Sequence, residues 1–101
     1  MIFGNKIREL REKQGLLLRQ LAAKLEIDTA TISKIELGTR QAKKEHLPIF
    51  SKILKIDLQE LETLWLADKL YDIVENEVCG LPALKVAEKE IKYKIRTNDE
   101  E

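Results

Sequence analysis

Apolar residues recur at helical spacing along most of the chain. Near the N-terminus the repeat predicts a helix over residues 3–14, in which Phe3, Ile7 and Leu10 share one face. Gly15 follows directly, at the position where a residue in the left-handed conformation commonly ends a helix. The first helix is therefore expected to end just before this glycine.

The next two repeats are short and closely spaced. They predict helices over residues 18–25 and 29–37, joined by a turn of about three or four residues. Asp28 is a good N-cap for the second of these helices, and Gly38 ends it. The positions expected to be buried are Leu18, Leu21, Ala22, Leu25, Ile32 and Ile35.

Two further helices are expected in the middle of the chain. A fourth helix is predicted over residues 45–54, although the ring of Pro48 disfavours a helix unless it lies in the first turn. Asp57 and Glu60 have the spacing of a capping box, in which the first residue caps the helix and the second reaches back. From this start a longer helix is expected to run to about Glu75.

Gly80 and the proline two residues after it interrupt the pattern before the C-terminal segment. A last helix is expected over residues 82–96, and the polar, acidic residues 97–101 are expected to form a disordered tail. The chain is therefore predicted to be all-α. A five-helix domain is expected over residues 1–66 and a helical extension over residues 67–96.

The composition agrees with one soluble helical protein. Of 101 residues, 44% are hydrophobic and 36% are charged, and only four glycines and two prolines argue against a turn-rich β fold. No apolar run approaches a membrane span and the N-terminus lacks a secretion-signal pattern, so a cytoplasmic location is expected. Cys79 is the single cysteine, which excludes an internal disulfide; it is expected to be a small buried hydrophobe.

The net charge of zero hides an asymmetry between the two halves of the chain. Residues 1–56 contain 12 Lys and Arg against 6 Asp and Glu, whereas residues 57–101 contain 6 against 12. A basic first half favours a polyanionic partner such as nucleic acid. An acidic second half would be repelled by phosphates, and suits an interface or a solvated outer face.

Residues 17–38 carry the most specific signal. Small Ala22 lies where two short helices would cross closely, which is helix-turn-helix geometry. The pattern Leu-Ala, a short turn and Ile-Ser-x-Ile-Glu-x-Gly-x-Arg, matched here from Leu21 to Arg40, resembles helix-turn-helix regulators of the phage Cro and CI type (the XRE family). The resemblance covers about residues 3–66 and implies a five-helix DNA-binding domain.

The same resemblance implies that the helix at about residues 28–37 enters the major groove of double-stranded DNA. Thr and Ser hydroxyls can bond base edges there, and the methyl groups of Ala and Thr can contact thymine. The base-reading candidates are Thr29, Ala30, Thr31, Ser33, Lys34 and Arg40. The candidates for contact with the DNA backbone are Arg19, Gln20, Thr39, Lys43 and Lys44.

Arg11 and Glu36 are given a structural role by the resemblance. An Arg late in the first helix and a Glu late in the third form a mostly buried ion pair that orients the recognition helix. One departure concerns the start of the second helix, where Ser-Gln is usual in the family and Leu17 and Leu18 stand here. This change removes a cap and a phosphate contact, and leaves the next two residues to compensate.

No feature of the sequence points to an enzyme. A Gly-rich phosphate loop, metal-ligand spacing and a nucleophile elbow are all missing, and no cofactor, metal or small-molecule ligand is expected. His46 is the single histidine and belongs to no catalytic or metal-binding pattern in the sequence. It is expected to be a helix-surface residue.

The segment beyond residue 66 holds more apolar residues than a solvated tail needs. It could pack on its own monomer or form a dimer, and a dimer is favoured because one recognition helix of small residues would bind weakly. A twofold dimer would place two such helices about 34 Å apart on a near-palindromic site. The dimer candidates are Trp65, Leu70, Tyr71, Ile73, Val74, Val78, Leu81, Leu84 and Ile91.

Two classes of function remain open at this level. The first is a transcriptional repressor or activator, as in phage-type repressors and restriction–modification controller proteins; the controller type is favoured because the chain holds no cleavage or ligand domain. The second is an antitoxin-like module whose residues 67–96 bind a partner protein. A stable twofold dimer of the purified protein would favour the first, and a monomer with an exposed apolar tail the second.

Overall fold

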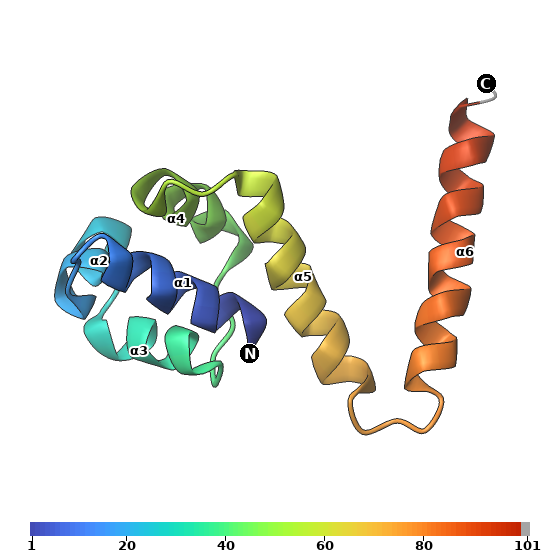
Figure 1. Cartoon of the computed structure of the whole chain (residues 1–101), viewed down its shortest axis with the longest axis horizontal. Helices are drawn as coiled ribbons and strands as arrows, with labels where there is room; N and C mark the ends of the chain where they lie inside the picture. Colours follow the sequence, from blue (N-terminus) through green and yellow to red (C-terminus); the bar gives the residue numbers. More distant parts are fainter. Residues whose placement is uncertain (100–101) are drawn as a thin grey trace. The chain divides into compact units, whose positions relative to one another are not determined.

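The computed structural model describes residues 1–99, and within them every regular element is a helix (Figure 1). This confirms the predicted all-α fold class. None of the helices within this range is long and apolar enough to span a membrane. The elements are α1 (Ile2–Lys13), α2 (Leu18–Leu25), α3 (Thr29–Leu37), the 3-10 turn η1 (Lys44–His46), α4 (Leu47–Leu54), α5 (Leu58–Val74) and α6 (Gly80–Asp99).

The helices α1 to α4 and the first part of α5 share one hydrophobic core. Helix α3 packs against both α1 and α2, and α4 packs against α1. The rings of Phe3 and Phe50 meet edge to face, with centroids 6.0 Å apart and an interplanar angle of 89°. The largest side chains that are fully buried are Ile7, Leu21, Ile32, Leu47, Phe50, Leu54 and Leu61. This core holds the third helix against the first two.

The fourth helix begins later than the sequence pattern predicts. It starts at Leu47, not at residue 45, and the preceding residues form η1. Pro48 explains the difference. Pro48 lies in the first turn of α4, where N–H groups have no partner within the helix, so its missing N–H costs no hydrogen bond. In a helix that began at residue 45, Pro48 would be the fourth residue, and one backbone hydrogen bond would be lost.

The described chain forms two compact units, residues 1–69 and the residues from Leu70 onward. The second unit contains the end of α5, a connector over residues 75–79 and α6. The backbone approaches itself closely at this connector. A Cβ atom placed on Gly80 would lie 2.6 Å from the carbonyl oxygen of Val74, so no larger residue fits without a shift.

The last helix is longer than expected at both ends. It begins at Gly80, where the N–H of Ala83 donates to the carbonyl oxygen of Cys79 at 2.9 Å, so the proline again falls within the first turn. It also includes residues 97–99, which the sequence pattern assigned to a disordered tail. In this turn the hydroxyl of Thr97 donates to the carbonyl oxygen of Tyr93 at 2.8 Å. Residues 100 and 101 of the expected tail lie outside the described residues.

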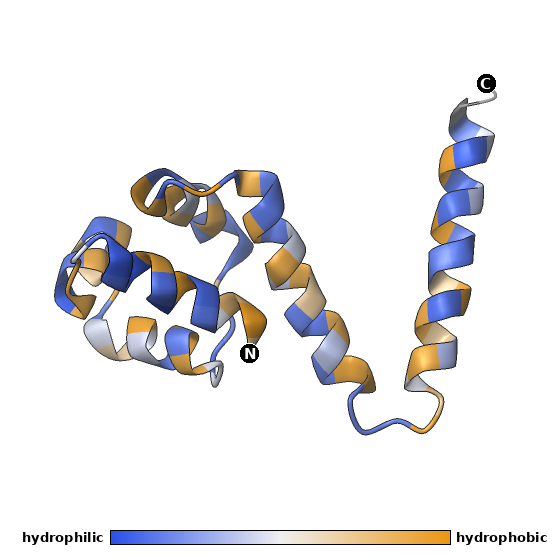
Figure 2. Ribbon diagram, in the orientation of Figure 1, coloured by the Kyte–Doolittle hydropathy of each residue, from blue (hydrophilic) through white to orange (hydrophobic). Residues whose placement is uncertain are grey.

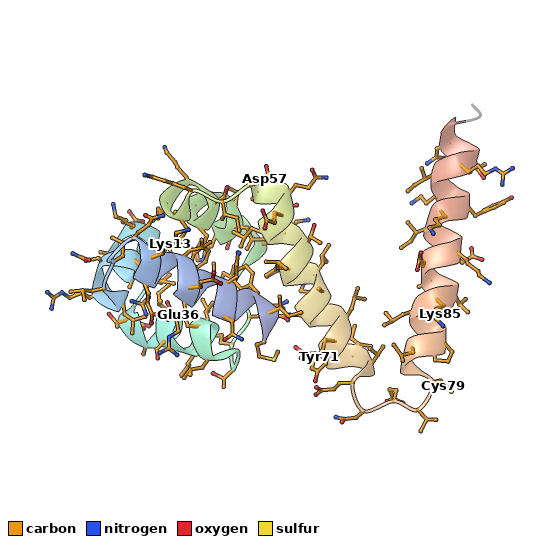
Figure 3. The ribbon with its side chains drawn as sticks, in the orientation of Figure 1. Lys13, Glu36, Asp57, Tyr71, Cys79 and Lys85 are labelled. Atoms are coloured by element: carbon orange, nitrogen blue, oxygen red, sulfur yellow. The ribbon has the colours of Figure 1, made fainter. Side chains whose placement is uncertain are left out.

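The second unit buries very little of its own surface. Figure 2 shows hydrophobic and hydrophilic residues side by side around α6, yet none of its described side chains is buried. Cys79 is exposed in the connector, where Figure 3 labels it, so the expectation that it is a buried hydrophobe is wrong. The physical reason is that residues 70–98 provide no core in which to bury it.

Candidate nucleic-acid interface

The turn between α2 and α3 is short and held by specific hydrogen bonds. Glu26 ends α2 in the left-handed conformation, with φ 57°, and the N–H of Ile27 donates to the carbonyl oxygen of Ala22 at 3.1 Å. Asp28 then caps α3, because its carboxylate accepts a hydrogen bond of 2.7 Å from the N–H of Thr31. The start of the third helix is therefore fixed relative to the second.

Two cations lie near this cap. The hydrogen bonds that Asp28 accepts from Thr31 are the main cause of its lowered pKa, and the positive charges of Arg40 and Lys34 lower the pKa further. Arg40 lines the same depression as Asp28 and Thr31, at the N-terminus of α3.

The third helix divides cleanly into a buried and an outward face. Ile32 and Ile35 are 0% and 3% exposed and pack into the core. The opposite face keeps contact with solvent along the whole helix. Its sequence-predicted members, each exposed or half-buried, are Thr29, Ala30, Thr31, Ser33 and Lys34.

The residues after α3 are anchored to the end of the helix. The carbonyl oxygen of Lys34 accepts hydrogen bonds from the N–H groups of Thr39 at 3.0 Å and Arg40 at 3.3 Å. The hydroxyl of Thr39 donates to the same oxygen at 3.3 Å, so in this structure it serves as part of the helix end. The guanidinium group of Arg40 consequently extends from a fixed backbone position.

Two depressions gather cationic residues, one beside α3 and one formed by the segment after it together with α5. The first is lined by Ile27, Asp28, Thr31, Ile35, Arg40, Gln41, Lys43 and His46. The second is lined by Gln41, Ala42, Lys43, Lys44, Glu45, Trp65 and Lys69. Together they bring the predicted Arg40, Lys43 and Lys44 to one neighbourhood.

Sequence reasoning missed two members of this surface. His46, at the end of η1, is half-buried and lines the first depression beside Arg40 and Lys43. Lys69 joins the second depression from α5, with its Nζ 3.9 Å from the centroid of the Trp65 ring. Nothing in the local sequence signals either placement, because only the folded core brings these segments together.

The ion pair expected between Arg11 and Glu36 is present between α1 and α3. It has two hydrogen bonds, Nε to Oε2 at 2.7 Å and Nη2 to Oε1 at 3.1 Å, and the two side chains are only 11% and 6% exposed. The Nη1 of Arg11 also donates to the carbonyl oxygen of Leu16 at 2.8 Å. The hydrogen bond to Glu36 is the main cause of the raised pKa of Arg11, against an opposing effect of burial.

The start of α2 shows how the chain tolerates its departure from the family pattern. Leu17 offers no side-chain cap, and its backbone N–H instead donates to Oε1 of Gln20 at 2.8 Å. Half of a capping box is thus retained. Leu18 packs against the core, while Arg19 stays exposed in the first turn.

The N-terminus of α1 lies against two other helices of the first unit. Asp68 of α5 accepts hydrogen bonds from the N–H groups of Ile2 and Phe3. Gly4 faces α3, where an added Cβ would lie 2.6 Å from the carbonyl oxygen of Glu36. The third helix is therefore positioned at its C-terminal part by this close approach, in addition to the ion pair.

The predicted dimer candidates fall into two groups. Trp65 is 6% exposed and its indole N–H donates to the carbonyl oxygen of Ala42 at 2.7 Å, so it belongs to the core of the first unit. The remaining candidates belong to the second unit and keep exposed or half-buried surface. They are Leu70, Tyr71, Ile73, Val74, Val78, Leu81, Leu84 and Ile91.

The comparisons with known proteins agree with this geometry. A family model described as helix-turn-helix matches residues 7–61, which is more than half of the chain. The chain belongs to the XRE-type helix-turn-helix family. Its members are DNA-binding transcriptional regulators, typically without enzymatic activity. Searches of curated proteins and of solved structures gave no match.

The residues matched by the family model can be assigned to the helices of the structure. The match spans most of α1, the whole of α2 and α3, and the chain as far as Leu61 in α5. The helix-turn-helix regulator therefore has its DNA-binding domain in the first unit. Within residues 1–99 no group of His, Cys, Asp and Glu side chains could hold a metal ion.

Proposed function

We propose that this helix-turn-helix regulator binds a near-palindromic operator as a homodimer and reads each half-site with α3. The observation that carries the proposal is the outward face of this helix. Its small hydroxyl and methyl side chains allow close approach to base edges, and Lys34 and Arg40 extend from its margin. The buried pair of Arg11 and Glu36 supports this role because it holds the helix at one orientation.

The cations beside α3 supply the electrostatic part of binding. Lys43, Lys44 and Lys69 line one depression, and Arg19 is exposed at the start of α2. Each cation that meets a phosphate releases counterions, so affinity is expected to fall steeply as the salt concentration rises. A flat response to salt would contradict this assignment.

A dimer is proposed because a single α3 is a modest reader. None of its outward side chains is an Arg or Asn able to make two hydrogen bonds with one base. Pairing two copies doubles the contacts, and sets the spacing of the half-sites to about one helical turn of DNA. The exposed apolar residues of the second unit provide the surface for this pairing.

Sequencing DNA fragments that the purified full chain selects from a random pool tests the proposal. Two inverted half-sites with a fixed spacing are the expected result. Enrichment of a single half-site would contradict the dimer, and no enrichment would contradict sequence-specific binding. Controller-type autoregulation, as in restriction–modification systems, adds the expectation that the selected sequence occurs upstream of the protein's own gene.

A second candidate function is an antitoxin-like module, in which the C-terminal helix binds a partner protein. The observation that favours it is that α6 buries none of its described side chains. Analytical ultracentrifugation of the purified protein separates the two candidates. A stable dimer supports the regulator that acts alone, whereas a monomer supports a protein that is completed by another chain.

A further inference from the structure

The second unit carries opposite charges on two consecutive segments. Residues 70–79 contain Asp72, Glu75 and Glu77 and no basic residue. Residues 80–96 contain five Lys and Arg against two Glu. The acidic character assigned to the C-terminal half therefore belongs to residues 57–79 and to the last three residues of the sequence, while residues 80–96 are basic.

Both segments also expose apolar side chains. On the acidic segment, Ile73 is 69% exposed and Val78 is 99% exposed. On the basic helix, Leu81, Ile91 and Ile95 are each more than half exposed. A helix that buries no side chain is marginal in water, because helices in proteins gain most of their stability from packing an apolar face.

Four apolar residues of α6 form a stripe with basic margins, while Val86 and Tyr93 are exposed on the opposite side. Leu81, Leu84, Ile91 and Ile95 are spaced by three, seven and four positions, which places them on one side of the helix. The same spacing puts Lys85 on one margin of the stripe and Lys94 on the other. Glu88 interrupts the stripe between Leu84 and Ile91 and is paired within the helix with Lys92 at 2.7 Å, so the face keeps a net positive charge. An acidic, apolar surface is therefore the complement of this face.

Two identical copies of this stripe would not pair well with each other. In such a pairing the lysines on the margins would meet lysines of the partner, and like charges that face each other across a helix pair are destabilising. The acidic segment of residues 70–78 carries the opposite charge and its own exposed apolar residues. The described chain does not cover its own stripe with this segment, since both remain exposed.

We propose that α6 of one copy packs on residues 70–78 of a second copy, and that the same contact recurs reciprocally about a twofold axis. This inference rests on the homodimer proposed above and names the surfaces that form it. The close contact of Gly80 with Val74 joins the two segments within each copy, so that one copy offers both halves of the contact. Each dimer then contains two copies of this contact. In each copy, one stripe is buried and Lys85 and Lys94 lie near the carboxylates of residues 70–78.

Charge reversal on the full chain tests the contact. One variant reverses the margins of the stripe, Lys85→Glu with Lys94→Glu, and a second reverses the acidic segment, Asp72→Lys with Glu77→Lys. Each variant alone is expected to weaken dimerisation by about tenfold or more, because attraction becomes repulsion at both copies of the contact. The variant with all four changes is expected to recover a dimer within a few-fold of the wild type.

The control is Lys89→Glu, which changes charge on the side of α6 away from the stripe. It is expected to leave the dimerisation constant unchanged. Sedimentation gives the dimerisation constant of each variant, and the unfolding transition of the helix-turn-helix domain shows that each variant is folded. If the variant with all four changes sediments as a dimer while each two-change variant does not, the reciprocal contact is supported.

Three results would overturn it. If none of the charge reversals changes the dimerisation constant, other surfaces form the dimer; the proposed function as a dimeric regulator would still stand. Preferential pairing of the Lys85→Glu, Lys94→Glu chain with the wild-type chain shows that α6 pairs with α6. A wild-type protein that is monomeric at micromolar concentration removes the homodimer itself, and the inference with it.

Discussion

The carboxylate of Asp68 caps the N-terminus of α1 by accepting hydrogen bonds from the N–H of Phe3 at 2.9 Å and of Ile2 at 3.1 Å. Helix α1 receives no side-chain cap from Met1, and its first turn contains no acidic residue. A residue from α5, 65 positions away from Phe3, therefore satisfies N–H groups that a local cap would normally satisfy. The same hydrogen bonds tie the first and fifth helices together.

Asp68→Ala is expected to lower the free energy of unfolding by about 0.5–2 kcal/mol, the usual cost of losing an N-cap. The amide protons of Ile2 and Phe3 should also exchange faster with solvent, because their acceptor is lost. Denaturant unfolding and hydrogen exchange measure the two effects. Glu62→Ala, on the same helix, is the matched control and should leave both amides protected as in the wild type.

Gly4 provides a second test of how α1 positions the third helix. A Cβ at this position would contact the backbone carbonyl oxygens of Ile35 and Glu36, and backbone atoms cannot rotate aside. Gly4→Ala is expected to cost about 1–3 kcal/mol by overpacking, and to shift α3 away from α1. Chemical shifts of the amides in α3 would report the movement. Gly15→Ala meets no atom within 4 Å, so it should carry only the cost of its φ of 70° and leave α3 in place.

Local patterns predicted most of the helices of the first unit, because caps and apolar spacing act within a few residues. The ends of α2 and α3 follow directly from the stripe of Leu21, Ala22 and Leu25, from the cap at Asp28 and from Gly38. The later start of α4 depends on one proline in its first turn. Pro48 disfavours a helix unless it lies in the first turn, yet the pattern of apolar residues still predicted that the helix begins at residue 45.

Long-range relationships left no local trace in the sequence. The cap that Asp68 provides for α1, the approach of Gly4 to α3 and the place of Lys69 beside Lys43 all depend on the packed core. The exposure of Cys79 was missed for the opposite reason. An apolar pattern predicts burial only where a partner surface exists, and residues 70–98 provide none within the described chain.

The ion pair of Arg11 and Glu36 should dominate the stability of the first unit. Glu36→Leu removes both hydrogen bonds of the buried pair and leaves the guanidinium group only the more distant, exposed Glu12 at 3.8 Å, and is expected to cost about 3–5 kcal/mol in denaturant unfolding. The double variant Arg11→Met with Glu36→Leu removes both charges and should be more stable than this single variant. The control is Arg8→Ala, which breaks an exposed pair with Glu12 and should cost less than about 1 kcal/mol. Equal losses for Glu36→Leu and Arg8→Ala would contradict the assigned role.

Because the carboxylate of Asp28 caps α3, the free energy of unfolding is expected to depend on pH in the acid range. Because its pKa is lowered in the folded protein, the ionised carboxylate stabilises the fold above its ordinary pKa of 3.8, and this contribution is lost as the pH falls through the lowered value. Asp28→Ala should therefore be less stable than the wild type at pH 7. The difference should shrink below pH 3.8. Unfolding curves at several pH values measure it, and Asp28→Asn, which caps without titrating, should show no such trend of its own. A difference that is the same at pH 7 and pH 3 would mean that the carboxylate charge contributes nothing.

The proposed role of Arg40 is tested by comparing specific with nonspecific DNA. If its guanidinium group bonds a base, Arg40→Ala should weaken binding to the selected operator by about 1–3 kcal/mol, while binding to unrelated DNA changes much less. Lys44→Ala should instead weaken both kinds of DNA alike and make the dependence on salt shallower by about one ion. Lys52→Ala, on the exposed side of α4, is the control and should change neither. Equal losses on both DNAs for Arg40→Ala would assign this residue to the phosphate backbone, and specificity would then rest on Lys34 and the small side chains of α3.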